Sequence, residues 1–302
     1  MQVQHRGRRS RPHGLAWAML GASLLLPQTA WSCSVCQCGD YTVTLLGTEK
    51  NYAGRWRVAT EWLMRNKTQS DRHTEEWRLN FSSSYAVSDR LSLAARLPLV
   101  DKQFSDPNLT GQTARGFGDL DLTARYVLSD QTIPARWVYG WQAGLRIPTG
   151  ETVRTADGQL VDIDAQPGTG ALIPALGGFI GHFQFPWMSY LTAQVSPRTK
   201  GDQGFEPAAH TVLTWTQQYA PSPRWAAQLA LESRWAGRNR YDGVIDANSG
   251  GLVSYLTPGL AWRAGAELLV GVAAQLPLIE ALNGDQDETG EIRLQLTYDL
   301  PS

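Results

Sequence analysis

A two-residue alternation of apolar and polar side chains constrains this chain more than any other feature of its sequence. In the C-terminal stretch EIRLQLTYDL, every even position from Ile292 to Leu300 is apolar, and every odd position from Glu291 to Asp299 is polar. Successive side chains of a β-strand point to opposite faces of the sheet. The stretch is therefore predicted to be a strand with one apolar face and one polar face.

About 12 segments of this kind follow one another, and short turns alternate with longer polar loops. The predicted strands are 55–65, 76–87, 91–100, 117–128, 136–147, 172–183, 187–196, 208–219, 225–235, 252–262, 266–276 and 290–300. The predicted long loops are 67–74, 101–115, 149–170, 198–207, 237–250 and 279–289. An even strand number with short turns on one side and long loops on the other is typical of outer-membrane barrels. The expected fold class is all-β, a transmembrane antiparallel β-barrel.

A soluble sandwich would also alternate, so the aromatic residues are needed to separate the two folds. The chain has 12 tryptophans, and several lie at the ends of apolar faces, as Trp56, Trp137 and Trp225 do. Barrels that cross a membrane carry aromatic girdles at both interfaces. After residue 32 no apolar run approaches the roughly 20 residues that a spanning helix needs. A barrel is therefore favoured over a soluble protein of the periplasm.

The start of the chain indicates export. A basic stretch precedes an apolar run of about a dozen residues, 15–26, and the small residues Ala30 and Ser32 follow it. We expect residues 1–32 to be a signal peptide. Residues 33–54 form a Cys-containing N-terminal segment that could act as a periplasmic plug, and residues 55–302 form the barrel.

If the apolar faces meet lipid, the polar faces line the lumen. The expected pore-lining residues are Arg57, Glu61, Arg78, Arg96, Asp119, Asp121, Arg125, Arg136, Arg146, His210, Glu232, Arg234, Glu267 and Arg293. Both signs of charge are present, and the formal net charge of the chain is −1. A ring of one sign would select ions, and this mixture predicts no such selection. His182 is a further candidate for the inner face.

All three cysteines, Cys33, Cys36 and Cys38, lie in the stretch CSVCQCGD. Lipidation of Cys33, a disulfide in an oxidising compartment, and a site for Cu(I) or Zn, which prefer thiolate ligands, remain open. A c-type haem is excluded because Gln37 stands where the motif needs His.

Two motifs resemble a known family. GFGDLDLTARYVL, with Gly118, Asp119 and Leu120, is followed about 20 residues later by GLRIPTGE. The second motif contains Pro148, Thr149 and Gly150. Their order resembles the outer-membrane transport proteins grouped as the MetA-pathway of phenol degradation family, which are similar in style to FadL-like channels. The resemblance implies a transport barrel, and the motifs are specific only over 116–151.

These observations predict an outer-membrane channel or transporter for small solutes, with hydrophobic or aromatic compounds as one option. The alternative is a metal-handling outer-membrane protein that uses Cys33, Cys36 and Cys38. No nucleophile elbow, zinc-protease helix or phosphate-binding loop is present, so no enzymatic activity is expected. No basic patch indicates nucleic-acid binding. The expected surroundings are outer-membrane lipid, a small-molecule solute and the barrel-assembly machinery, in a Gram-negative bacterium with both termini periplasmic.

Overall fold

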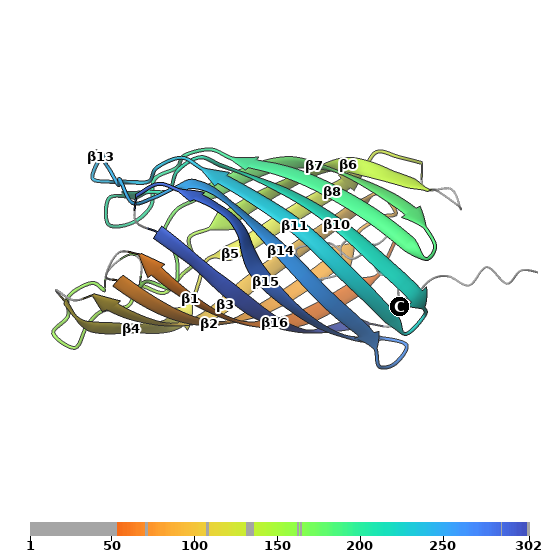
Figure 1. Cartoon of the computed structure of the whole chain (residues 1–302), viewed down its shortest axis with the longest axis horizontal. Helices are drawn as coiled ribbons and strands as arrows, with labels where there is room; N and C mark the ends of the chain where they lie inside the picture. Colours follow the sequence, from red (N-terminus) through yellow and green to blue (C-terminus); the bar gives the residue numbers. More distant parts are fainter. Residues whose placement is uncertain are drawn as a thin grey trace, which may run out of the picture. The chain divides into compact units, whose positions relative to one another are not determined.

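The chain forms a closed antiparallel β-barrel whose strands cross obliquely in the computed structural model of Figure 1. The structure describes residues 53–69, 72–106, 109–130, 136–161, 163, 165–284 and 286–300. The predicted signal peptide and residues 33–52 of the Cys-containing segment lie outside these ranges. Among the described residues, there is no helix with the length and apolar character of a membrane span.

Thirteen strands form one sheet, which closes because its first and last strands in the chain pair with each other. β1 pairs with β16 from Trp56↔Leu300 to Gln69↔Gln286. β4 and β5 follow each other along the same edge of β3, so the sheet has 12 positions around the wall. The strands of this sheet are β1 (Trp56–Gln69), β2 (Arg72–Ala86), β3 (Leu91–Asp106), β4 (Leu109–Phe117), β5 (Leu120–Val127), β6 (Trp137–Ile147), β7 (Ile173–Gln184), β8 (Trp187–Ser196), β10 (His210–Ser222), β11 (Trp225–Ala236), β14 (Gly251–Arg263), β15 (Leu268–Leu282) and β16 (Gln286–Leu300).

The wall is apolar outside and polar inside, as the alternation predicts. On β16, Leu294 and Leu296 are 46% and 51% exposed, whereas Gln295 and Thr297 between them are 5% and 1% exposed. A soluble protein buries its leucines and exposes its polar groups. This opposite arrangement is what a strand needs when its outer face meets lipid.

Aromatic pairs surround the end of the barrel that carries the short turns 87–90, 185–186 and 223–224, called here the turn end. The opposite end is called the loop end. The ring centroids of the pairs are 4.4–6.0 Å apart, namely Trp56–Tyr85, Tyr126–Trp141, Trp137–His182, Trp187–Tyr219 and Trp225–Trp262. Such a band suits the membrane interface. His182 therefore belongs to the outer aromatic band and not to the inner face, which corrects its expected position.

Three predicted loops are instead extensions of strands. Residues 67–74, 101–115 and 279–289 lie largely in the β1–β2, β3–β4 and β15–β16 hairpins, whose strands extend to the loop end. Beyond the membrane both faces of a strand can be polar, so the alternation that identifies strands disappears there. The loops 149–170, 198–207 and 237–250 are longer connections, as predicted.

These longer connections meet at the loop end. β9 (Phe205–Glu206), β12 (Arg240–Tyr241) and β13 (Val244–Ile245) form a small second sheet that joins the loop after β8 to the loop after β11. The Arg198 guanidinium also donates to the Arg238 carbonyl oxygen at 2.6 Å. The loops after β8 and β11 are therefore bonded to each other.

Candidate functional site

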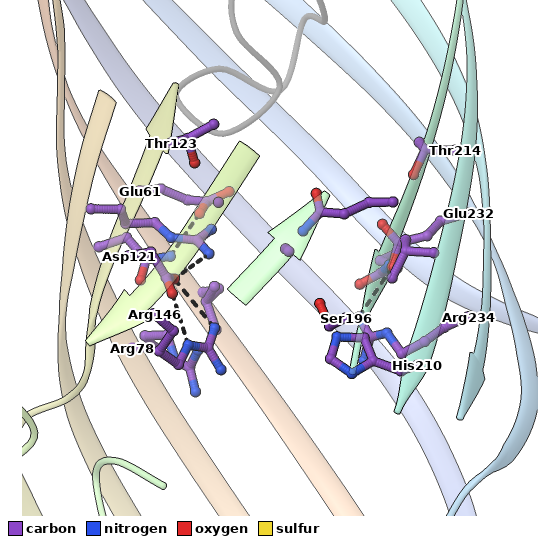
Figure 2. Close-up of a pocket in the computed structure, with 18 of the residues that line it drawn as sticks. Glu61, Arg78, Asp121, Thr123, Arg146, Ser196, His210, Thr214, Glu232 and Arg234 are labelled. Carbon is purple, nitrogen blue, oxygen red and sulfur yellow. Dashed lines mark hydrogen bonds and ion pairs between the residues drawn. The ribbon is translucent and has the colours of Figure 1, made fainter. Parts of the chain in front are cut away.

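The lumen contains a cavity of about 680 Å³ that is bordered by residues from all 12 wall positions. Figure 2 shows Glu61, Arg78, Asp121 and Arg146 on one side of this cavity, with His210, Glu232 and Arg234 opposite them. The groups come from inward positions on β1, β2, β5 and β6 on one side and from β10 and β11 on the other. The interior is therefore polar and large enough for several water molecules or a small solute.

Nine of the residues expected to line a pore border this cavity. They are Glu61, Arg78, Arg96, Asp121, Arg146, His210, Glu232, Arg234 and Arg293. Glu288 and Glu291 border it too. Glu291 follows the same alternation as Arg293, so the pattern could have identified it, whereas Glu288 fell inside a predicted loop.

The remaining five expected residues lie elsewhere. Arg57 is buried at the turn end and pairs with Asp299 at 2.7 Å. Asp119 lies in the break between β4 and β5, and Arg125 points inward beyond the cavity. Arg136 and Glu267 do not border the cavity, because β6 begins at Trp137 and β15 begins at Leu268. The predicted strands began one residue too early at the first of these turns and two residues too early at the second.

Shared carboxylates organise one wall of the cavity. Asp121 on β5 accepts from Arg96 and from Arg146, each at 2.7 Å. Glu76 on β2 is likewise shared between Arg65 at 2.8 Å and Arg78 at 2.5 Å. Glu61 on β1 is a third acid on this side of the cavity. The wall built by β1, β2, β3, β5 and β6 thus has these four arginines against three acids and carries a surplus of one positive charge.

Each of the two arginines on the opposite wall has an acid of its own. Glu232 pairs with Arg234 at 3.1 Å, and Glu291 pairs with Arg293 on the neighbouring position of β16. Glu288 adds a further carboxylate to the lining. The charges are thus unevenly distributed across the lumen, a property that the near-zero net charge of the chain does not indicate.

The residues of the two sequence motifs bond to each other at the loop end. The buried Asp119 carboxylate accepts from the Gly150 amide at 3.1 Å, and from the amide and hydroxyl of Thr169 at 2.7 and 2.8 Å. The Leu120 amide donates to the Thr149 hydroxyl at 3.0 Å. An ideal Cβ on Gly150 or Gly168 would lie within 2.8 Å of the Asp119 carboxylate. Only glycine therefore allows this close approach.

A second anchor holds the same loop, residues 148–172, against β3. The Lys102 ammonium donates to the Gln166 carbonyl oxygen at 2.8 Å. The Gln166 side chain bonds to the backbone of Val153 and Val161 at 2.8–2.9 Å.

A smaller cavity of about 170 Å³ separates the Gln166–Thr169 segment from Arg78, Arg96 and Arg146. The loop therefore lies next to the positively charged wall. Sequence reasoning missed Gln166 and Thr169, although the glycines 168 and 170 on either side of Thr169 signal close packing.

The turn-end half of the lumen is closed by side chains. Thr123, Thr192 and Thr216 border the large cavity. The next inward residues on the same strands are Arg125, Tyr190 and Gln218, which are 2%, 2% and 1% exposed.

Glycines on neighbouring strands make room for the aromatic rings that fill this half. A Cβ on Gly140 would lie 2.7 Å from the Phe179 ring, and a Cβ on Gly181 would lie 2.9 Å from Tyr190. Phe179 and Tyr190 form a buried cluster with Val127 and Val138. In this conformation a solute in the cavity meets a packed layer of side chains toward the turn end.

The described residues contain no group of three or more His, Cys, Asp and Glu side chains that could hold a metal ion. Cys33, Cys36 and Cys38 lie outside the described ranges, so the predicted Cu(I) or Zn site and the disulfide and lipid alternatives stay predictions. What the described interior offers is a polar, charged cavity for a solute.

Comparison with known proteins agrees on the fold. The sequence matches no protein-family model and no curated protein. Among solved structures, it is similar to the COG4313 outer membrane channel from Pseudomonas putida F1, with a TM-score of 0.66 and 17% identity over 83% of this chain and 98% of that one. The CymD monoaromatic hydrocarbon channel (TM-score 0.42, 11% identity, 83% and 89% covered) and the translocator domain of autotransporter NalP from Neisseria meningitidis (0.47, 10%, 83% and 90%) are more distant. The predicted outer-membrane-type β-barrel fold is confirmed.

Proposed function

We propose that this protein is an outer-membrane channel for small polar solutes. The observation that carries the proposal is the reversed polarity of the wall, in which leucines and tryptophans face outward and arginines, acids and amides face a cavity of about 680 Å³. Lipid suits the first surface and an aqueous solute suits the second. The two chain ends would then lie in the periplasm, on the side of the short turns, and the barrel-assembly machinery would insert the chain.

The charged interior favours polar cargo over hydrophobic cargo. Twelve of the cavity-lining residues are Arg, Glu, Asp or His, and a hydrophobic solute that displaced water from them would leave them poorly solvated. Aromatic compounds that carry a polar or charged group remain compatible with this lining.

We also propose membership of the MetA-pathway of phenol degradation family. The hydrogen bonds from Gly150 to Asp119 and from Leu120 to Thr149 give the two motifs a shared purpose, which is to hold the loop 148–172 at the mouth of the barrel. That purpose explains why Gly-Asp-Leu and Pro-Thr-Gly occur together.

Two measurements test the channel function. Outer-membrane fractions should contain the mature chain, and it should migrate faster on a gel when it is not boiled, because the closed barrel stays folded in detergent. The purified protein should then produce discrete conductance steps in planar lipid bilayers. A protein that is monodisperse in buffer without detergent would contradict the membrane barrel, and a stable barrel without conductance would contradict the channel.

A further inference from the structure

Arg125 is a buried cation without an ion pair among the described residues. Its side chain is 2% exposed, and its Nε and Nη2 atoms have no hydrogen-bond partner within the part of the chain that the structure describes. The described inward carboxylates of these strands are engaged by other arginines, since Asp121 on β5 pairs with Arg96 and Arg146, and Asp299 at the turn end pairs with Arg55 and Arg57. A buried charge with unsatisfied donors is costly unless something compensates it.

The surroundings of Arg125 compensate only part of that cost. Its guanidinium carbon lies 3.9 Å from the centre of the Phe179 ring and 5.5 Å from that of Tyr190, which are cation–π contacts. Its neighbour in register on β6 is Gln142 and on β3 is Ser92, and neither of these carries charge. Aromatic faces stabilise a cation, but they do not accept the in-plane N–H bonds of a guanidinium.

Positive charge dominates this half of the lumen as a whole. Among the described strand residues, the inward charged groups between the cavity and the turn end are Arg57, Arg125, Arg263 and Asp299. Three arginines thus face one carboxylate. A solute that leaves the large cavity toward the turn end must cross this layer.

We propose that Arg125 makes the turn-end half of the lumen a filter for small anions, with organic monocarboxylates as the class of solute. The planar guanidinium fork of arginine matches the two oxygens of a carboxylate, and the unpartnered Nε and Nη2 atoms are the donors that a carboxylate would occupy. Arginine in a constriction is also a recognised basis for anion selectivity. This inference rests on the proposed channel function and adds the charge and chemical class of the cargo.

Reversal potentials of single channels in a KCl gradient test the proposal directly. The unaltered protein should pass chloride in preference to potassium. Arg125→Gln should lower the chloride-to-potassium permeability ratio on the order of tenfold, because one unit charge is removed from a layer of low effective dielectric constant. Arg224→Gln on the exposed β10–β11 turn is the matched control and should leave the ratio unchanged.

A lysine variant separates charge from the guanidinium fork. Arg125→Lys should keep the preference for chloride over potassium but lower the permeability of acetate relative to chloride, because an ammonium cannot bind both carboxylate oxygens in one plane.

Three results would overturn the inference. A potassium preference in the unaltered protein would overturn it without touching the channel function, and so would an unchanged ratio in a conducting Arg125→Gln channel. An acetate-to-chloride ratio that is unchanged in Arg125→Lys would overturn the assignment to carboxylates. Absence of any conductance in the unaltered, folded barrel would overturn the channel function and this inference together.

Discussion

The two halves of the lumen are lined by inward residues of the same strands, but these residues are packed differently. Toward the loop end, Asp121 and Glu76 each bridge two arginines around a cavity of about 680 Å³. Toward the turn end, Phe179 and Tyr190 lie against glycines and leave Arg125 almost inaccessible. Charged groups can stay partly hydrated in the first half and must be packed in the second.

This difference in packing predicts different roles for the two halves in conduction. Ion pairs that border water contribute little to stability and adapt easily to a passing solute. A packed aromatic layer changes only when a side chain rotates, so it can set the rate of passage. We therefore expect the turn-end half to limit conductance and the loop-end half to tune it.

Phe179→Ala should remove the packed layer at the turn end and produce the largest change in conductance. The ring lies across the backbone of Gly140 and covers Arg125, so its removal opens space next to the cavity that water can enter. We expect single-channel conductance in planar bilayers to rise severalfold. Phe81→Ala, which removes an outward ring that is 42% exposed, should leave conductance unchanged. Equal conductance in both variants would show that the packed layer is not the limiting barrier.

Asp119→Ala should release the loop over the cavity. Three donors, the Gly150 amide and the amide and hydroxyl of Thr169, would lose their acceptor, and an unsatisfied buried donor costs about 1–3 kcal/mol. We expect protease to cleave the folded barrel within residues 148–172 much faster, with noisier current through single channels. Asp157→Ala at the exposed tip of the same loop is the control. Equal cleavage rates in the two variants would remove Asp119 from its anchoring role.

The wall of the barrel could be predicted from the sequence because it depends on local alternation. The alternation of Ile292 to Leu300 with Glu291 to Asp299 matches the exposure of β16. Even β7, whose glycines blur its alternation, was placed as 172–183 and runs over Ile173–Gln184. The hairpin extensions were missed because no lipid imposes a polarity on them.

The depth of a side chain in the lumen could not be predicted in the same way. The alternation put Arg125 and Asp121 on one inward face, yet Asp121 borders the large cavity and Arg125 is packed against Phe179. That difference comes from β7 and β8, strands distant in sequence whose Phe179 and Tyr190 rings lie against the Arg125 guanidinium. The bond between Asp119 and Thr169 spans 50 residues and was invisible for the same reason.

Asp121→Asn should shift the selectivity for anions over cations without opening the barrel. It would leave Arg96 and Arg146 without their shared carboxylate, so the chloride-to-potassium permeability ratio should rise roughly threefold. Conductance should change less than in Phe179→Ala. Asp89→Asn on the exposed turn after β2 provides the control. A lower ratio in Asp121→Asn would contradict the positive surplus assigned to this wall.

Glu232→Gln on the opposite wall should have the smallest effect, and its size relative to Asp121→Asn measures the asymmetry of the lumen. Glu232 pairs with Arg234 alone, at 3.1 Å, and the Arg234 side chain is 45% exposed. Water and salt screen such a pair strongly, so the permeability ratio should rise by less than about twofold. Raising the salt concentration should reduce this change further, whereas the effect of Arg125→Gln should persist because the packed layer around Arg125 leaves little room for a screening atmosphere of ions. If Glu232→Gln shifted selectivity as much as Asp121→Asn, the two walls would be electrostatically equivalent, and the layer around Arg125 alone would set the preference for anions.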